Sequence, residues 1–326
     1  MSDSQNGQNP PRQAPKLPEK ATKKRGRKTL GWVIVAVVVA AAITVTGIVV
    51  GNRTTGETAK ASAKTVSIGV TDAAQPYWKT FSRLAAKELD VKVKIVNFTD
   101  YSQPNPALSQ GQLDLNEFQH IEFLADYNVS AHDDLQPIGA TAVYPLPLYS
   151  TKYTSVSALP KGGTVALPND AINEARGLLV LQSAKLLTLK DGGTPFSTAS
   201  DIVSSKVKVL PVDAAQTAVA LKNGSAVAAI VNNNFAVSAG LPHKDAIFTD
   251  DPASPSAKPY VNVFVARAAD KNNALYKKLA ALYQNPAVKA GVQKSNGGTA
   301  VFRTTSAKEL QAELAKVEAQ ERATKK

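Results

Sequence analysis

Asn173 and Arg176 have types and a spacing that suggest carboxylate binding. They stand three residues apart in LPNDAINEARGLLVL, which puts both side chains on one face of a helix, and Asn169 or Asp170 is a suitable N-cap for that helix. A guanidinium beside the free amides of a helix start is a strong carboxylate receptor, because its planar fork and the helix dipole act together. The alternative is a solvated arginine paired with Asn173 or Glu174.

Aromatic residues follow two predicted strands further toward the N-terminus. Tyr101 stands in the turn after one strand, and Phe118, His120 and Phe123 lie at and just beyond the end of the next. Aromatic side chains beside strand ends can wall an apolar slot, and tyrosine and histidine add polar tips to it. The alternative is that Phe118 and Phe123 fill the core.

An asparagine run ends a third apolar strand, in VAAIVNNNFAVSAGL. Ligands of open α/β sheets bind at the carboxyl ends of strands, which is where Asn232 stands. An amide offers both an acceptor and donors, and these suit an ammonium and a carboxylate held together. The alternative is an asparagine-rich turn, because asparagine tolerates the left-handed backbone. Together the three groups predict a site for a small zwitterion.

Alternating strands and helices are predicted to position these groups. Short β-branched runs alternate with amphipathic stretches, a pattern that indicates βαβ units and a mainly parallel sheet. Strands are predicted at 65–70, 91–98, 113–118, 136–143, 163–168, 206–212, 226–232, 246–250 and 260–268, and helices at 76–89, 173–187, 213–224 and 272–285. The proline-rich segment 250–259 is either a crossover back to the first lobe or a plain loop. The charged helix at 306–326 is predicted to be a solvated surface helix, or alternatively a partner-binding one.

Composition and missing motifs exclude several classes of protein. The chain has 326 residues, enough for two domains, with 44% hydrophobic residues and no cysteine. Disulfides, thiolate metal sites, a cysteine nucleophile and a lipid-modified cysteine are therefore excluded. The sequence contains no hydrolase elbow, phosphate loop, dinucleotide fingerprint or zinc-protease motif, and its three histidines are far apart. We therefore expect no enzyme activity, cofactor or metal.

The net charge of +12 is concentrated at the N-terminus. Residues 1–29 hold eight basic and two acidic side chains, which is half of the excess, in a tail with few apolar residues. We therefore expect no nucleic-acid binding. The 22 uncharged residues 30–51 can cross a bilayer, and the basic run before them places the N-terminus in the cytoplasm. The alternative is a cleaved secretory signal. Residues 52–65 are predicted to be a flexible linker.

The sequence resembles a known family, the methionine-binding substrate-binding lipoproteins of ABC importers (NLPA family). FTDY at 98–101, FQH at 118–120, PNDAINEAR, the asparagine-rich strand end and GLPHKDAIF followed by YVNVFV occur in the family's order. The resemblance runs from about Val66 to Phe302. It implies a two-lobed, periplasmic-binding-protein-like α/β fold (type II), which in this chain would follow the transmembrane helix predicted at 30–51. Lobe 1 would comprise 66–145 and 250–326, and lobe 2 would comprise 146–249.

The resemblance also implies a ligand and partners. The ligand would be methionine or a similar amino acid, captured outside the cell and delivered to an ABC permease with its ATPase. The implied site residues are Tyr101, Phe118, His120 and Phe123 around the thioether, and Asn173, Arg176 and Asn232 around the α-amino and α-carboxylate groups.

Two departures from the family's pattern stand out. The family usually has Pro-Tyr where this chain has Glu122 and Phe123, and the transmembrane span replaces the family's lipid-carrying cysteine as the anchor. The alternatives are another apolar amino acid, a methionine-containing dipeptide, or an extracellular enzyme or sensor on the same fold.

Overall fold

The computed structural model describes residues 64–324. The basic tail, the predicted span at 30–51 and all of the predicted linker except Lys64 and Thr65 lie outside this range. Those two residues belong to the first strand. Within the described range, no helix combines the length and the apolar character that a membrane crossing requires.

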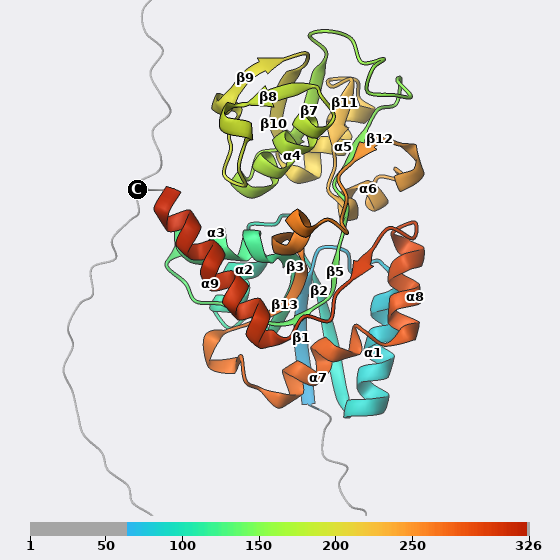
Figure 1. Cartoon of the computed structure of the whole chain (residues 1–326). Coiled ribbons are helices and arrows are strands. Elements are labelled where there is room, and N and C mark those ends of the chain that lie inside the picture. Colours follow the sequence, from blue (N-terminus) through green and yellow to red (C-terminus); the bar gives the residue numbers. More distant parts are fainter. Residues whose placement is uncertain (1–63, 325–326) are drawn as a thin grey trace, which may run out of the picture. The chain divides into compact units, whose positions relative to one another are not determined.

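Two five-stranded sheets form the centres of two lobes (Figure 1). The first lobe has the order β2-β1-β3-β13-β4, and the second has the order β10-β7-β11-β6-β12. The first sheet contains β1 (Lys64–Val70), β2 (Val91–Asn97), β3 (Leu115–His120), β4 (Gln136–Ala140) and β13 (Asn262–Ala266). The second contains β6 (Pro147–Tyr149), β7 (Thr164–Pro168), β10 (Lys208–Val212), β11 (Ala228–Ile230) and β12 (Ala246–Thr249). Two small sheets pair β5 (Ala142–Val143) with β14 (Val301–Phe302), and β8 (Leu187–Leu189) with β9 (Ile202–Ser205).

The prediction of a mainly parallel sheet is confirmed for both large sheets, in each of which four strands run in one direction and one strand runs against them. In the first sheet β1 runs parallel to β2 and β3, but β13 runs antiparallel to β3 and β4. In the second sheet β7 runs parallel to β10 and β11, but β6 runs antiparallel to β11 and β12. Both antiparallel strands follow a crossover from the other lobe. Each of them enters its sheet at the edge where the parallel strands end and therefore runs in the opposite direction. In the first sheet, for example, Asn262 at the start of β13 pairs with His120 at the end of β3.

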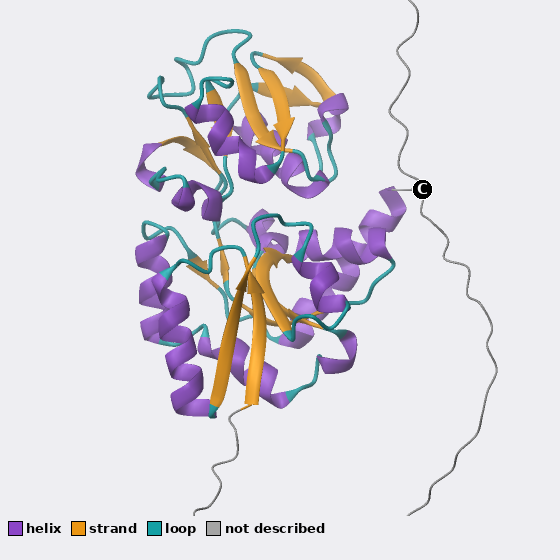
Figure 2. Ribbon diagram, turned by 180° about the vertical axis from the view of Figure 1, so that it is seen from behind, coloured by secondary structure: helices purple, strands orange, loops and turns teal. Residues whose placement is uncertain are grey.

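Helices cover both faces of the first sheet (Figure 2). One face packs against α1 (Pro76–Leu89), α7 (Ala274–Leu282) and α8 (Pro286–Ser295), and the other packs against α2 (Pro104–Ser109), α3 (Ile121–Ala131) and α9 (Ala307–Thr324). The second lobe carries α4 (Ala171–Ser183), α5 (Thr217–Lys222) and α6 (Asn233–Ser238). Helix α1 begins with Pro76, whose fixed φ suits a first helical turn, and buries Trp78 and Phe81.

The predicted solvated helix at the C-terminus is packed on one face instead. Leu310, Leu314 and Val317 of α9 are buried in the cluster that includes α3 and the face of β13. Their spacing of three and four residues forms an apolar stripe, which the high charge of the other face obscured. Helix α9 therefore belongs to the core of the first lobe.

Candidate functional site

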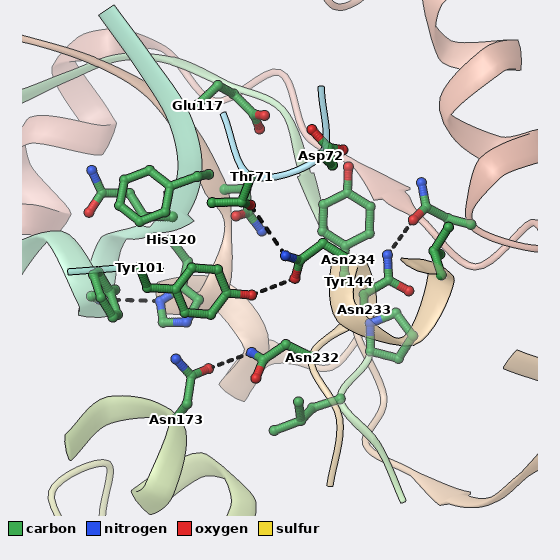
Figure 3. Close-up of a pocket in the computed structure, with 18 of the residues that line it drawn as sticks. Thr71, Asp72, Tyr101, Glu117, His120, Tyr144, Asn173, Asn232, Asn233 and Asn234 are labelled. Carbon is green, nitrogen blue, oxygen red and sulfur yellow. Dashed lines mark hydrogen bonds between the residues drawn. The ribbon is translucent and has the colours of Figure 1, made fainter. Parts of the chain in front are cut away.

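A pocket lies between the lobes, at the ends of β1, β3 and β11 (Figure 3). Its volume is about 90 Å³. One water needs about 10 to 15 Å³ of such space, so the pocket holds a molecule of roughly six to nine non-hydrogen atoms, the size of one amino acid. All seven predicted site residues line it: Tyr101, Phe118, His120, Phe123, Asn173, Arg176 and Asn232.

Asp170 fixes the orientation of two amides in the pocket. It is the N-cap of α4, and its Oδ1 accepts hydrogen bonds from the backbone N–H and from Nδ2 of Asn173, both at 2.9 Å. The Oδ1 of Asn173 therefore faces Asn232 and accepts from its Nδ2 at 2.8 Å. This leaves Oδ1 of Asn232 as a buried acceptor that no described residue satisfies. Such an atom needs a donor, and a ligand ammonium is a suitable one.

The asparagine run is not a left-handed turn. Asn232 has a φ of −58° and stands at the N-cap position of α6, which begins at Asn233. The next two asparagines reach across to the first lobe. Nδ2 of Asn233 donates to Oδ1 of Asn296, Nδ2 of Asn234 donates to Thr71 at 3.3 Å, and the hydroxyl of Tyr101 donates to Asn234 (Figure 3). The lobes are thus bonded to each other directly.

Arg176 is buried rather than solvated, so the alternative pairing with Asn173 or Glu174 is wrong. It is 6% exposed, and its Nε and Nη2 donate to Oδ2 of Asp250 at 3.0 and 2.7 Å. Nη2 also donates to the carbonyl of Tyr144 at 2.8 Å. Within residues 64–324 Nη1 has no hydrogen-bond partner, which makes it the nitrogen available to a ligand carboxylate.

Sequence reasoning missed Asp250 as the partner of Arg176. Asp250 follows β12 directly, and its Oδ1 accepts from the backbone N–H of Leu146 at 2.7 Å. Residues 144–146 lead into the second lobe and Asp250 leads out of it. Arg176 therefore connects α4 to both crossover segments. The contact could not be read from the sequence, because Arg176 and Asp250 are 74 residues apart.

The aromatic residues form a wall of the pocket. Tyr101 lies 6.0 Å from Phe118 and 6.0 Å from Phe123, measured between ring centroids, and 5.1 Å from Phe235 of α6. Phe118 and Phe123 are both half-buried and lie outside the buried core clusters. The alternative that they fill the core is therefore wrong.

His120 is a neutral hydrogen-bond donor. Its Nδ1 accepts from the backbone N–H of Phe123 at 3.2 Å, which places the proton of the neutral ring on Nε2. Burial and the positive charge of Arg176 lower the pKa of His120 to about 3. The side chain is 7% exposed and lines the pocket, so it can present an N–H to a ligand oxygen or sulfur.

Two carboxyl groups in the pocket were not predicted. Asp72 accepts from the hydroxyl of Tyr77 and, at 2.7 Å, from Nε1 of Trp78. Glu117 accepts from the hydroxyl of Thr141 at 2.9 Å. Burial, followed by the charge of Asp72, raises the pKa of Glu117 to about 8. The one available signal was the acidic residue inside NEFQH, directly before an aromatic candidate.

The described residues contain no grouping of three or more histidine, cysteine or carboxylate side chains that could hold a metal ion. What the pocket offers is amide, guanidinium and imidazole donors together with an aromatic wall. This arrangement can bind a small polar molecule and exclude water from it.

Known proteins are similar to this chain over most of the described residues. A family model described as NlpA lipoprotein matches residues 66–303. A curated relative, the D-methionine-binding lipoprotein MetQ of Yersinia pestis, is 37% identical over 72% of this chain and 87% of its own length.

Solved structures are similar as well. A nutrient-binding protein from Burkholderia cenocepacia bound to methionine has a TM-score of 0.67 and 35% identity over 73% of this chain and 99% of that one. The substrate-binding protein of a methionine transporter from Streptococcus pneumoniae has a TM-score of 0.67 and 34% identity over 73% and 95%. The predicted two-lobed α/β fold is thereby confirmed.

Proposed function

Because the chain belongs to the NlpA lipoprotein family, we propose that it captures methionine or a close analogue between its lobes and delivers it to an ABC importer. The protein is a substrate-binding protein and not an enzyme. The observation that carries the proposal is the convergence of Arg176, the Asn232 acceptor and the aromatic wall on a pocket of amino-acid size.

Each part of the ligand has a partner in this proposal. Nη1 of Arg176 donates to the α-carboxylate. Oδ1 of Asn232, to which no described residue donates a hydrogen bond, accepts from the α-ammonium. The thioether lies against Tyr101, Phe118 and Phe123, beside the Nε2 donor of His120. A pocket of about 90 Å³ favours a single amino acid over a methionine-containing dipeptide.

Delivery follows from lobe closure. The ligand contacts side chains of both lobes. It therefore stabilises the closed arrangement over an open one by as much as it binds the closed arrangement more tightly. An ABC permease with its ATPase would then recognise the closed form and accept the ligand.

Methionine is expected to bind more tightly than the other uncharged amino acids. One methylene more or less in an apolar pocket changes binding by about 1 to 3 kcal/mol, so norleucine and leucine should compete weakly and alanine hardly at all. Isothermal titration calorimetry on the full-length chain measures this order. If serine or glutamine bound more tightly than methionine, the apolar-slot argument would be wrong. Recovery of unchanged methionine after incubation separates binding from turnover.

Residues 30–51 are proposed to anchor the chain in the cell membrane, with the binding domain outside. Their 22 uncharged residues after a basic tail support this. Protease added to intact cells is expected to digest the domain beyond residue 65. An undigested domain would contradict the topology, and a mature N-terminus near Ala61 would identify a cleaved signal instead.

A further inference from the structure

The pocket is lined by more acidic than basic side chains. Among its lining residues, all within the described part of the chain, Arg176 alone carries a positive charge, because His120 is neutral. That charge is already balanced by Asp250 at 2.7 Å. Asp72 and Glu117 also line the pocket. The pocket therefore lacks a counter-charge for two carboxyl groups.

The partners of these two carboxyl groups are neutral. Asp72 accepts from a tyrosine hydroxyl and an indole, and Glu117 accepts from a threonine hydroxyl. Glu117 is 6% exposed, and a buried carboxylate without a counter-charge is costly. A ligand that supplied a cation would remove this cost.

A proton on Glu117 avoids a second buried negative charge while no cation is bound. Burial and the neighbouring Asp72 raise the pKa of Glu117 to about 8, so Glu117 is largely protonated at pH 7. Besides Asp72, the titratable groups that interact with Glu117 are the hydroxyls of Tyr77, Tyr144 and Tyr283, which burial keeps neutral. A cation beside Glu117 would lower this pKa and release the proton.

The two carboxyl groups lie away from the amides that bind the α-groups. Figure 3 shows Asp72 and Glu117 on the opposite side of the pocket from Asn173 and Asn232, with Tyr101 between them. If the amides and Arg176 hold the amino-acid end of the ligand, its side-chain end points toward the carboxyl groups. Tyr144 also lines this side, and aromatic faces attract weakly hydrated cations.

We propose that Asp72 and Glu117 form a subsite for a positively charged side-chain end of the ligand, with Glu117 as the specificity-determining residue. The proposal rests on the proposed function, which supplies the orientation of the ligand. The ligand class is an α-amino acid of methionine's length whose side chain ends in a cation such as a sulfonium.

The probes are methionine, S-methylmethionine and ethionine, titrated calorimetrically into the full-length chain in detergent at pH 7. S-methylmethionine adds a methyl group and a positive charge to methionine, whereas ethionine adds a methylene without charge. We expect S-methylmethionine to bind at least about tenfold more tightly than methionine, which is about 1.4 kcal/mol, and ethionine to bind no more tightly than methionine.

The isosteric variant Glu117→Gln tests the residue. It should reduce the preference for S-methylmethionine over methionine to within about threefold, since it removes the charge and keeps the shape. Titrations in buffers of different ionisation enthalpy should also show about one proton released with S-methylmethionine in the unmutated protein and none in the variant. The control Glu122→Gln removes a buried carboxyl group outside the pocket and should keep the preference.

The outcomes separate the two proposals. If methionine binds and S-methylmethionine binds no more tightly, the acidic subsite is wrong and the proposed function stands. An unchanged preference in Glu117→Gln also overturns the subsite. If neither ligand binds, the proposed function fails and the subsite fails with it. Should Glu117→Gln not fold, Asp72→Asn makes the same test, and an unreduced preference in that variant overturns the subsite.

Discussion

Replacing Arg176 with alanine is expected to weaken methionine binding by about 2 to 5 kcal/mol, or roughly thirty-fold to several-thousand-fold. The variant leaves the ligand carboxylate desolvated and removes the cation that it shares with Asp250. Arg176→Lys should recover only part of the loss, because an ammonium restores the charge without the planar fork. Asn232→Ala removes a hydrogen bond to the ammonium and should cost about 1.5 to 3 kcal/mol. Calorimetry measures all three variants.

The variant Asp250→Asn distinguishes two roles of Arg176, which are binding the ligand and holding the two crossover segments together. This variant keeps the shape of the Arg176 contact and weakens its charge pairing. If Arg176 acted only through its pairing with Asp250, Asp250→Asn and Arg176→Ala would weaken methionine binding to a similar degree. We expect Arg176→Ala to be clearly worse, with exposed Lys79→Ala as a neutral control. Binding within threefold of the unmutated protein in a folded Arg176→Ala variant would remove Arg176 from the site.

Phe264→Ala is expected to lower the free energy of unfolding by about 3 to 5 kcal/mol. Phe264 is fully buried in β13, with ring centroids 6.0 Å from Phe81 and 5.9 Å from Tyr283. The variant would leave a cavity among rigid rings in the central part of the first sheet, where the surroundings cannot collapse easily. Urea denaturation followed by circular dichroism measures the loss. A loss below about 1 kcal/mol would show that the aromatic rings around Phe264 relax into the cavity. The control Val219→Ala, at a half-exposed position, should leave the free energy of unfolding nearly unchanged.

The sequence predicts the residues of the pocket better than their contacts. Asn232 could be placed because a strand ends beside it, and the carboxyl ends of strands meet at one edge of a sheet. The pairing of Arg176 with Asp250 could not be predicted, because it depends on where the chain re-enters the first lobe. Glu117 looked like an ordinary residue of a strand, since nothing local indicates that both faces of β3 are covered.

Helices α3 and α8 and several short elements were missing from the predicted fold. Strand β6 lies in the proline-rich PLPLY, a composition that argues against a central strand, yet it pairs with β11 and β12. The predicted helix at 173–187 ends at Ser183, because Lys185 takes the left-handed conformation and Leu187 begins β8. These outcomes depend on tertiary pairing, which overrides the local pattern.

The hydrogen bond between Trp78 and Asp72 gives the protein an optical reporter. Trp78 is 2% exposed and its indole N–H is held by a carboxyl group of the pocket wall. A ligand that changes the charge or position of Asp72 therefore changes the electric field at a ring from which water is excluded. The sequence has one other tryptophan, Trp32, so the variant Trp32→Phe leaves Trp78 as the single emitter. Its fluorescence after rapid mixing would follow closure of the lobes in real time without a dye.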